Sequence, residues 1–329
     1  MTDKESLRKT IRARINDVLV DAEFPELPNF GRGKVRDHYD LSGNRRLMIT
    51  TDRQSAFDQV LAAVPFKGQV LTAAARFWFE QTADIVPNHV IEYPDPNVVL
   101  ARKMNMLPIE VVVRDYLTGT TSTSVWSMYH VGNRKPYGIQ LPDGMKKNEK
   151  LPQTILTPTT KGLMGDHDMP VTTAQIIERG LLSEAQMRDL EQAALALFEK
   201  GKEIAAKHGL ILVDTKYEFG YDENGILTIA DEIHTPDSSR YWIAETYEER
   251  MNNGLEPDSL DKEFLRLWIS ARCDPYNEPI PDIPDDTLVD FSARYIDLYE
   301  KISGKNFEIP PYGEPIRERV RRNIKKYVE

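Results

Sequence analysis

Cysteine is almost absent from this chain of 329 residues, which contains only Cys273. A single cysteine cannot form an intrachain disulfide, and it excludes a metal site built from several thiolates. This composition suits a reducing compartment. The six histidines form no H-x-x-x-H or similar pair, so the sequence does not indicate a zinc site either.

Long apolar runs are also absent. The first residues, MTDKESLRKTIRARIND, lack the apolar core of a signal peptide, and no apolar run approaches the length of a membrane span. We therefore expect a cytoplasmic protein that does not enter a membrane. The net charge of −10 disfavours broad binding of nucleic acid, although a local basic pocket can still bind an anionic substrate. Nothing in the sequence indicates an obligate protein partner.

The length and the 40% hydrophobic content fit a soluble globular protein of two domains or one large domain. Strands are expected before helices, which favours an α+β fold over regular βαβ repeats. The expected strands lie within 33–66 and 109–117. The expected helices cover 4–20, 68–82, a segment after the capping box of Ser183 and Gln186, 260–272, 286–303 and 315–327. Because residues 132–160 are rich in Gly, Pro and Lys, we expect them to be extended and mostly irregular.

Six carboxylates crowd into residues 214–232, where Asn224-Gly225 predicts a β-hairpin. Strand alternation places Lys216 and Glu218 on one face. A two- or four-residue loop would place Asp231 on that face too, whereas an odd-length loop or a bulge would not. Like charges opposed across strands are unfavourable, so a cation is expected there, either Lys216 or Mg²⁺. The alternative is an acidic face exposed to solvent.

Three further stretches are candidate sites. Gly31–Arg36 combines glycines with Lys34 and Arg36, which can meet phosphates, although it is not a Walker A loop and an ordinary turn is the alternative. Arg114 interrupts a β-branched run just before a Gly-Thr turn. The loop TPTTKGLMGDHD brings Lys161 close in sequence to Asp168.

Seven stretches of the sequence, several of which contain the candidate residues above, occur in the order typical of the SAICAR synthetase family and resemble its motifs. They are GKVRDHYD, TDRQSAFD, KGQVLT, VVVRDYLTG, LTPTTKG, LILVDTKYEFG and DEIHTPDSSR, which together cover about residues 30–245. The long 132–160 segment resembles the larger, eukaryotic-type form. The resemblance implies an ATP-dependent ligase of de novo purine biosynthesis, which joins L-aspartate to the carboxylate of carboxyaminoimidazole ribonucleotide (CAIR) and uses Mg²⁺.

The fold that the resemblance implies has two parts with an active-site cleft between them. A smaller β-rich N-terminal domain, expected over 1–110, is similar to a kinase N-lobe and binds nucleotide. A larger domain, expected over 111–329, is similar to ATP-grasp proteins and carries the acidic hairpin and the C-terminal helices.

The resemblance also implies a role for each candidate residue. The implied ATP contacts are Lys34, Arg36, Lys216, Glu218 and Asp231, and the implied metal ligands are Glu218 and Asp231. The implied contacts of CAIR are Arg114, Thr120, Asp237, Ser239 and Arg240, and the implied catalytic residues are Lys216, Lys161 and Asp168. Two positions depart from the family pattern, since Arg36 stands where lysine is usual and Thr120 where serine is common.

Two alternatives remain at this point. The same lysines and carboxylates would serve a small-molecule kinase that transfers phosphate and stops there. They would also be found in a nucleotide-binding module without activity, although the intact Lys216, Glu218 and Asp231 disfavour this. The products distinguish the kinase from the ligase, because only the ligase forms an amide and releases free phosphate.

Overall fold

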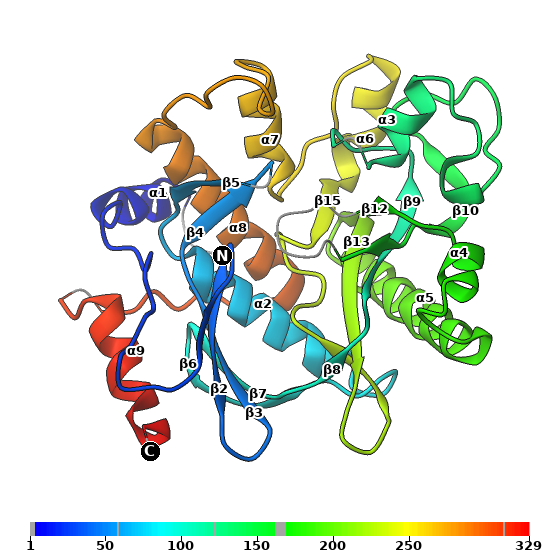
Figure 1. Ribbon diagram of the computed structural model, residues 1–329. Coiled ribbons are helices and arrows are strands. Elements are labelled where there is room, and N and C mark those ends of the chain that lie inside the picture. Colours follow the sequence, from blue (N-terminus) through cyan, green and yellow to red (C-terminus); the bar gives the residue numbers. More distant parts are fainter. Residues whose placement is uncertain (1–3, 58, 122, 162–168, 312, 329) are drawn as a thin grey trace. The chain divides into compact units, whose positions relative to one another are not determined.

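The computed structural model describes residues 4–57, 59–121, 123–161, 169–311 and 313–328. The chain divides into two compact units (Figure 1). Unit 1 contains Met1–Trp78, His89–Lys103 and Leu260–Glu329, and unit 2 contains Phe79–Asn88 and Met104–Ser259. Among the described residues, no helix is long and apolar enough to cross a membrane.

An antiparallel five-stranded sheet forms the centre of unit 1. Its order is β1 (Phe30–Arg32), β2 (Arg36–Leu41), β3 (Arg45–Thr50), β7 (Val98–Arg102) and β6 (Val90–Asp95), and a separate hairpin joins β4 (Arg53–Ala56) to β5 (Gln59–Ala63). A tight turn joins β2 to β3, because Leu41 pairs with Arg45. Gly43 and Asn44 adopt positive φ values there, which glycine and asparagine tolerate best.

Helices from both ends of the chain complete unit 1. They are α1 (Lys4–Ala13), α2 (Lys67–Gln81), which begins in unit 1, α7 (Glu263–Ser270), α8 (Asp285–Ser303), α9 (Ile316–Ile324) and η2 (Lys325–Tyr327). The prediction of one helix over 4–20 is wrong beyond Ala13. The chain extends there because the backbone N–H of Leu19 binds the buried carboxylate of Asp52 at 2.7 Å.

The two compact units differ from the predicted division in three respects. The chain passes to unit 2 at Lys103–Met104 instead of residue 110, the C-terminal helices group with unit 1, and Phe79–Asn88 group with unit 2. Packing explains the second difference. Val320 of α9 shares a buried cluster with Tyr39 of the sheet, and Phe291 of α8 shares another with Ile11 of α1.

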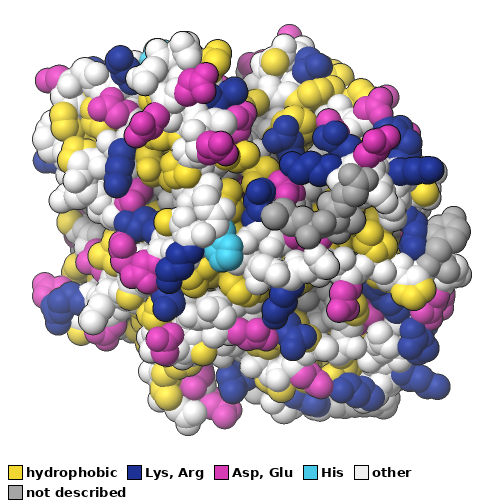
Figure 2. Space-filling model, turned by 180° about the vertical axis from the view of Figure 1, so that it is seen from behind, with side chains coloured by type: hydrophobic (Ala, Val, Ile, Leu, Met, Phe, Trp, Pro, Cys, Tyr) yellow, Lys and Arg dark blue, Asp and Glu magenta, His cyan; other side chains and the backbone are white. Residues whose placement is uncertain are grey.

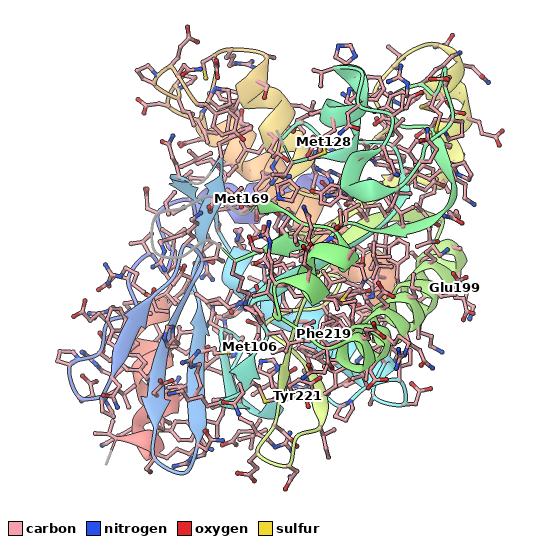
Figure 3. All side chains as sticks on the ribbon, turned by 45° about the vertical axis from the view of Figure 1, so that its right-hand side comes forward. Met106, Met128, Met169, Glu199, Phe219 and Tyr221 are labelled. Carbon is pink, nitrogen blue, oxygen red and sulfur yellow. The ribbon has the colours of Figure 1, made fainter. Side chains whose placement is uncertain are left out.

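Unit 2 is built on an eight-stranded antiparallel sheet whose longest strand is β13 (Leu210–Tyr221). β9 (Ile109–Tyr116), β14 (Leu227–Ala230), β15 (Ser239–Ile243) and β8 (Asn105–Met106) pair with β13, while β10 (Lys150–Leu156) and β11 (Thr159–Thr160) pair with β9, and β12 (Met169–Pro170) pairs with β11. Figure 3 shows Met106 of β8 close to Phe219 and Tyr221 of β13, in agreement with the pairing of Met106 with Gly220.

The helices of unit 2 are α3 (Val125–His130), η1 (Pro136–Gly138), α4 (Thr173–Glu178), α5 (Glu184–Lys207) and α6 (Ala244–Asn252). α5 lies beside β13 (Figure 1). Its predicted capping box is confirmed, since Ser183 and Gln186 exchange side-chain-to-backbone hydrogen bonds. The 132–160 segment is more ordered than predicted, because it contains η1, β10 and β11.

Candidate active site

The acidic hairpin has a register that differs from both predicted registers. Glu218 lies opposite Ala230 and Tyr221 opposite Leu227, so residues 222–226 form a five-residue loop. The wider loop is stabilised by Asp222, whose Oδ1 accepts hydrogen bonds from the backbone N–H groups of Asn224 and Ile226. The prediction of a two- or four-residue loop is therefore wrong, and strand alternation alone does not place Asp231 on the face of Glu218.

Asp231 nevertheless approaches the predicted cluster by a different route. It directly follows the end of β14 and has a φ of 61°, in the left-handed region that aspartate tolerates better than most residues. The strand geometry ends at this residue. Its carboxylate contributes to raising the pKa of Lys216, so it lies within electrostatic range of that ammonium group.

Lys216 and Glu218 form the centre of a cluster of alternating charges, which we call the lysine–glutamate cluster (Lys216, Glu218, Glu110 and Lys161). The Nζ atom of Lys216 lies 2.6 Å from Glu218 Oε1 and 3.0 Å from Glu110 Oε1. Lys161 Nζ pairs with the other oxygen of Glu218. Strand neighbours therefore bring together Lys216 and Glu218 as predicted, and Lys161 joins them from the end of β11.

The charges of this cluster stabilise one another. Burial alone would lower the pKa of Lys216, but the carboxylates of Glu218, Glu110 and Asp231 outweigh it and raise the pKa well above its usual value. Burial would raise the pKa of Glu218, but Lys216 and Lys161 outweigh it and hold that pKa well below its usual range. Lys216 is therefore a fixed cation near neutral pH, suited to binding phosphate and unsuited to acting as a general base.

A second cluster lies on the same strand, and we call it the arginine–aspartate cluster (Arg114, Asp214 and Arg240). In the sheet, Asp214 of β13 lies opposite Arg114 of β9 and Arg240 of β15. Asp214 Oδ2 accepts hydrogen bonds from Arg114 Nη1 at 2.9 Å and from Arg240 Nη1 at 2.5 Å. The structure thus brings the two predicted arginines together at Asp214. The sequence did not indicate that Asp214 pairs with them.

The turn after β9 approaches Arg240 closely. Gly119 has a φ of 113°, and a Cβ atom at this position would lie 2.4 Å from the Cβ of Ser124 and 3.5 Å from Arg240 Nη2. Only glycine fits such an approach without displacing its neighbours. Thr120, the predicted hydroxyl donor, follows directly and is partly exposed.

The signature DEIHTPDSSR is organised by Thr235. Its hydroxyl donates to Glu232 Oε2 at 2.5 Å and accepts a hydrogen bond from the backbone N–H of Asp237 at 3.3 Å. Ser239 is buried, and its Oγ donates to the hydroxyl of Thr215 at 2.7 Å. Asp237 and Ser239 are therefore held within the signature next to Arg240.

His234, in the same signature, has a structural role that the sequence did not indicate. Its Nε2 lies 3.0 Å from the hydroxyl of Tyr217 and 3.2 Å from the carbonyl oxygen of Leu197 on α5. Burial lowers the pKa of His234 to about 3, so the ring is neutral. A Cβ on Gly201 would lie 2.7 Å from this ring, so glycine allows α5 to pack against it.

The predicted phosphate-binding turn of unit 1 lies between β1 and β2. Lys34 is exposed and Arg36 is partly exposed. Buried Arg53 fixes the turn from beneath, because it donates to the carbonyl oxygens of Gly33 and Lys34 and pairs with Asp37 at 2.6 Å. The turn is thus ordered by residues that the sequence did not single out.

Two residues, Glu110 and Arg53, were not predicted from the sequence, and one predicted residue has no structural outcome. Glu110 was detectable, because strand alternation from Arg114 places it on the same face. Arg53 carried no local signal, since its partners lie elsewhere in the chain. Asp168 lies outside the described residues. Among the residues that are described, no three His, Cys, Asp or Glu side chains gather as ligands for a metal ion.

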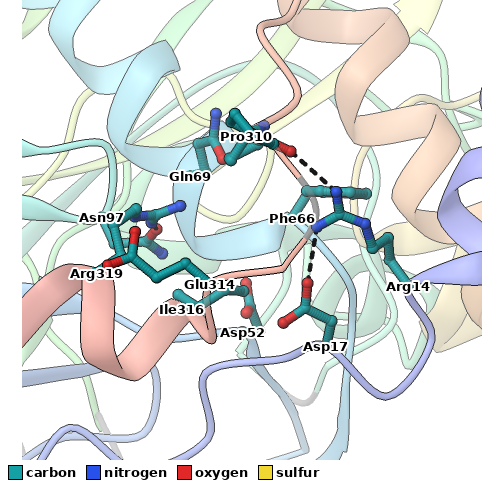
Figure 4. Close-up of a pocket in the computed structure, with 11 residues that line it drawn as sticks. Arg14, Asp17, Asp52, Phe66, Gln69, Asn97, Pro310, Glu314, Ile316 and Arg319 are labelled. Carbon is teal, nitrogen blue, oxygen red and sulfur yellow. Dashed lines mark hydrogen bonds and ion pairs between the residues drawn. The ribbon is translucent and has the colours of Figure 1, made fainter.

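Unit 1 contains a separate pocket of about 190 Å³, lined by both polar and apolar side chains, and none of the predicted site residues lines it (Figure 4). Arg14 crosses it, bound to Asp17 at 2.8 Å and to the carbonyl oxygen of Pro310 at 3.0 Å. Burial raises the pKa of Asp52 to about 6, although backbone N–H donors oppose the shift. The contacts of Arg14 join the N-terminal segment of unit 1 to its C-terminal segment at Pro310.

Figure 2 shows basic and acidic side chains interspersed over most of the face that it presents, and several Lys and Arg side chains gathered in its upper right part.

Solved structures define the class of protein. The chain matches a structure of the SAICAR synthase of Saccharomyces cerevisiae in complex with SAICAR, with a TM-score of 0.76 and 32% identity over 88% of this chain and 100% of that one. A type-2 SAICAR synthetase in complex with ADP matches with a TM-score of 0.65 and 26% identity, over 85% of this chain and 100% of the other. The fold is therefore that of a ligase of purine biosynthesis.

Sequence relatives define the family. A family model described as SAICAR synthetase matches residues 29–283. A protein of Agrobacterium fabrum with the provisional name phosphoribosylaminoimidazole-succinocarboxamide synthase 2 is 56% identical over 94% of this chain and 98% of its own length. The chain belongs to the SAICAR synthetase family. This confirms the predicted family, the two-part α+β fold and the ligase class, and it gives no support to the kinase alternative.

Proposed function

We propose that this chain joins L-aspartate to the carboxylate of CAIR at the expense of ATP, and releases SAICAR, ADP and phosphate. One observation carries the proposal: β13 presents a lysine–glutamate cluster and an arginine–aspartate cluster two residues apart. The first has the composition of a site for nucleotide phosphates, and the second has that of a site for a substrate phosphate. The SAICAR and ADP complexes of the matched structures support both substrate classes.

The chemistry requires an activated carboxylate. A carboxylate oxygen of CAIR attacks the γ-phosphorus of ATP and forms an acyl phosphate as ADP leaves. The amine of aspartate then attacks the acyl carbon, a proton is lost from nitrogen, and phosphate leaves. Transfer of the phosphoryl group depends on positioning and on cations that neutralise the developing charge. Lys216 and Lys161 supply fixed positive charge for this purpose.

Glu218 and Asp231 are our proposed ligands of Mg²⁺. They offer carboxylate oxygens, and Mg²⁺ prefers one or two carboxylates together with phosphate oxygens and water. When bound, the ion would supply further charge neutralisation at the phosphates of ATP. Lys216 balances part of the carboxylate charge and holds Glu218 in place at 2.6 Å.

Arg114 and Arg240 are the proposed anchors of the CAIR phosphate. Planar guanidinium groups can donate two parallel hydrogen bonds to a phosphate, which lysine cannot reproduce. Asp214 fixes both side chains, and their net charge with it is still positive. Thr120, Asp237 and Ser239 are the remaining proposed CAIR contacts.

Lys34 and Arg36 are proposed to contact the ATP phosphates from the turn that Arg53 orders. Asp168 is proposed to orient the amine of aspartate. A cytoplasmic location, and activity without an obligate protein partner, stay predictions.

An omission assay tests the function. The purified chain is given ATP, Mg²⁺, L-aspartate and CAIR, and each is left out in turn while ADP, phosphate and SAICAR are quantified. We expect equal amounts of the three products, and no SAICAR when any component is missing. A phosphorylated CAIR as the final product, or no product from CAIR at all, would refute the proposal.

A further inference from the structure

The 132–160 segment contributes three buried polar side chains to one place in unit 2. They are Tyr137, Asn148 and Thr157, and each contacts either Arg114 or the chain that follows β9. We call residues 117–121 the anchor turn. They follow the strand that carries Arg114, and they include Gly119, which approaches Arg240. The segment was expected to be irregular, but these contacts indicate that it supports Arg114 and the chain that follows β9.

Asn148 supports the anchor turn directly. Its Oδ1 accepts a hydrogen bond from the hydroxyl of Thr118 at 2.6 Å, and its backbone N–H donates to the carbonyl oxygen of Leu117 at 2.7 Å. Its Nδ2 donates to Glu256 Oε2 at 2.9 Å. These three hydrogen bonds fix the buried Asn148 residue at the start of the turn.

Thr157 orients the guanidinium group of Arg114. Its Oγ1 accepts a hydrogen bond from Arg114 Nε at 2.8 Å, while Asp214 binds Nη1 of the same group at 2.9 Å. The Thr157 side chain is completely buried. Two contacts on different nitrogens fix both the position and the plane of a guanidinium group.

Tyr137 holds the chain just beyond the anchor turn. Its hydroxyl donates to the carbonyl oxygen of Thr123 at 2.8 Å. Burial raises the pKa of Tyr137, and the charge of Arg114 opposes that shift. Tyr137 has a φ of 52°, an uncommon conformation for an aromatic residue.

The segment has an apolar core of its own that makes this support rigid. Leu117 of the anchor turn belongs to the same buried cluster as six residues from α3 and the segment, which are Val125, Tyr129, Tyr137, Leu141, Leu151 and Ile155. A turn that shares a close-packed cluster with its support cannot move independently of it.

We propose that the 132–160 segment is a positioning element for the substrate phosphate. Thr157 sets the geometry of Arg114, Asn148 sets that of the anchor turn, and Tyr137 holds the chain just beyond that turn. The inference rests on the proposed function, in which Arg114 binds the phosphate of CAIR. It assigns these three residues to discrimination between the phosphorylated nucleotide and its dephosphorylated nucleoside, and leaves ATP binding unaffected.

The test compares substitutions that remove a single hydroxyl group. In Tyr137→Phe and Thr157→Val, we expect kcat/KM for CAIR to fall about three- to tenfold, the scale of one hydrogen bond. The ratio of kcat/KM for CAIR to kcat/KM for its dephosphorylated nucleoside should fall by the same factor. The KM for ATP should not change. Thr157→Ser, which keeps the hydroxyl, should restore the ratio to within about twofold of wild type.

Tyr129→Phe is the matched control. Tyr129 belongs to the same buried cluster, but its hydroxyl binds Pro142 at 2.7 Å and Met145 at 3.0 Å, both within the segment. We expect its CAIR-to-nucleoside ratio to equal that of wild type. An equal loss of ratio in Tyr129→Phe and Tyr137→Phe, or a wild-type ratio in Tyr137→Phe and Thr157→Val, would overturn the inference. Failure of the wild-type chain to convert CAIR would instead refute the proposed function.

Discussion

The two charged clusters on β13 use the same strand in different ways. In the arginine–aspartate cluster, the side chains of Arg114, Asp214 and Arg240 are only 8%, 4% and 11% exposed. In the lysine–glutamate cluster, Lys216 is 29% exposed and Glu218 is 14% exposed. The first cluster is fixed by a neighbouring strand on each side, whereas the second also takes Lys161 from beyond the end of β11.

The two clusters should therefore differ in how much they contribute to stability and to catalysis. A buried carboxylate shared by two guanidinium groups is costly to remove, because the remaining charges lose their partner inside the protein. In the lysine–glutamate cluster, loss of Glu218 leaves Lys216 paired with Glu110 at 3.0 Å, so removal of one charge there should cost less stability. We therefore expect substitutions in the arginine–aspartate cluster to affect folding and CAIR binding, and those in the lysine–glutamate cluster to affect mainly catalysis.

The largest effect on turnover is expected from Glu218→Gln. It removes the charge that holds Lys216 and, in the proposed site, a ligand of Mg²⁺, so turnover should fall by about 100-fold or more. Asp231→Asn should behave similarly. Steady-state rates over a Mg²⁺ titration, together with thermal melting, check this. A nearly normal rate with unchanged Mg²⁺ dependence in either variant would defeat the metal assignment.

Asp214→Asn should have the largest effect on stability. It leaves two buried guanidinium groups without their shared carboxylate, and we expect the free energy of unfolding to fall by about 3 kcal/mol. Urea unfolding at neutral pH measures this. Glu218→Gln serves as the comparison on the same strand. If it destabilises the protein as much as Asp214→Asn does, the separation between the clusters is wrong.

Arg114→Ala and Arg240→Lys should each lower kcat/KM for CAIR by about tenfold or more, which corresponds to a lost charged hydrogen bond. Part of the loss should appear in kcat, because binding at the phosphate also positions the reacting carboxylate. Initial rates at varied CAIR concentration measure both constants. An unchanged kcat/KM for CAIR in both variants would remove these arginines from the substrate site.

Lys34→Ala should have a smaller and more selective effect. The exposed ammonium group is proposed to meet the ATP phosphates, so KM for ATP should rise severalfold while KM for CAIR changes little. The turn itself should persist, because Arg53 binds its backbone at Gly33 and at Lys34. Equal KM values for ATP in the wild type and the variant would count against this contact.

The smallest expected effect is on the stability of the protein at low pH. Lys216 and Lys161 hold the pKa of Glu218 below its unfolded value, against the effect of burial. The ionised carboxylate therefore stabilises the fold above about pH 4.5, and this contribution is lost as the pH falls toward the lowered pKa. Urea unfolding between pH 3 and 6 should show a shallower acid loss in Glu218→Gln. An identical pH dependence would show that the pairing adds no stability.

Sequence patterns predicted the elements on which the site is built. Alternation in LILVDTKYEFG placed Lys216 and Glu218 on one face, and the β-branched run before Arg114 predicted β9. These signals are local, since a strand or a capping box is determined by neighbouring residues. The family resemblance then supplied the roles.

The predictions that failed concern features that local sequence patterns do not determine. The hairpin loop has an odd length because the Asp222 side chain accepts hydrogen bonds from two backbone N–H groups, and that choice changed the expected position of Asp231. The C-terminal helices joined unit 1 through apolar faces that could have packed elsewhere. Asp214 and Arg53 acquired their roles only through partners that are distant in sequence.

Separate binding measurements on two variants test the central claim most directly. Calorimetric titrations of Glu218→Gln and Arg240→Lys with ATP alone and with CAIR alone give four affinities to compare with the wild type. We predict that Arg240→Lys loses affinity for CAIR and keeps that for ATP, and that Glu218→Gln shows the reverse. If both variants lose affinity for the same ligand, the two clusters form a single binding site and the proposed division along β13 is contradicted.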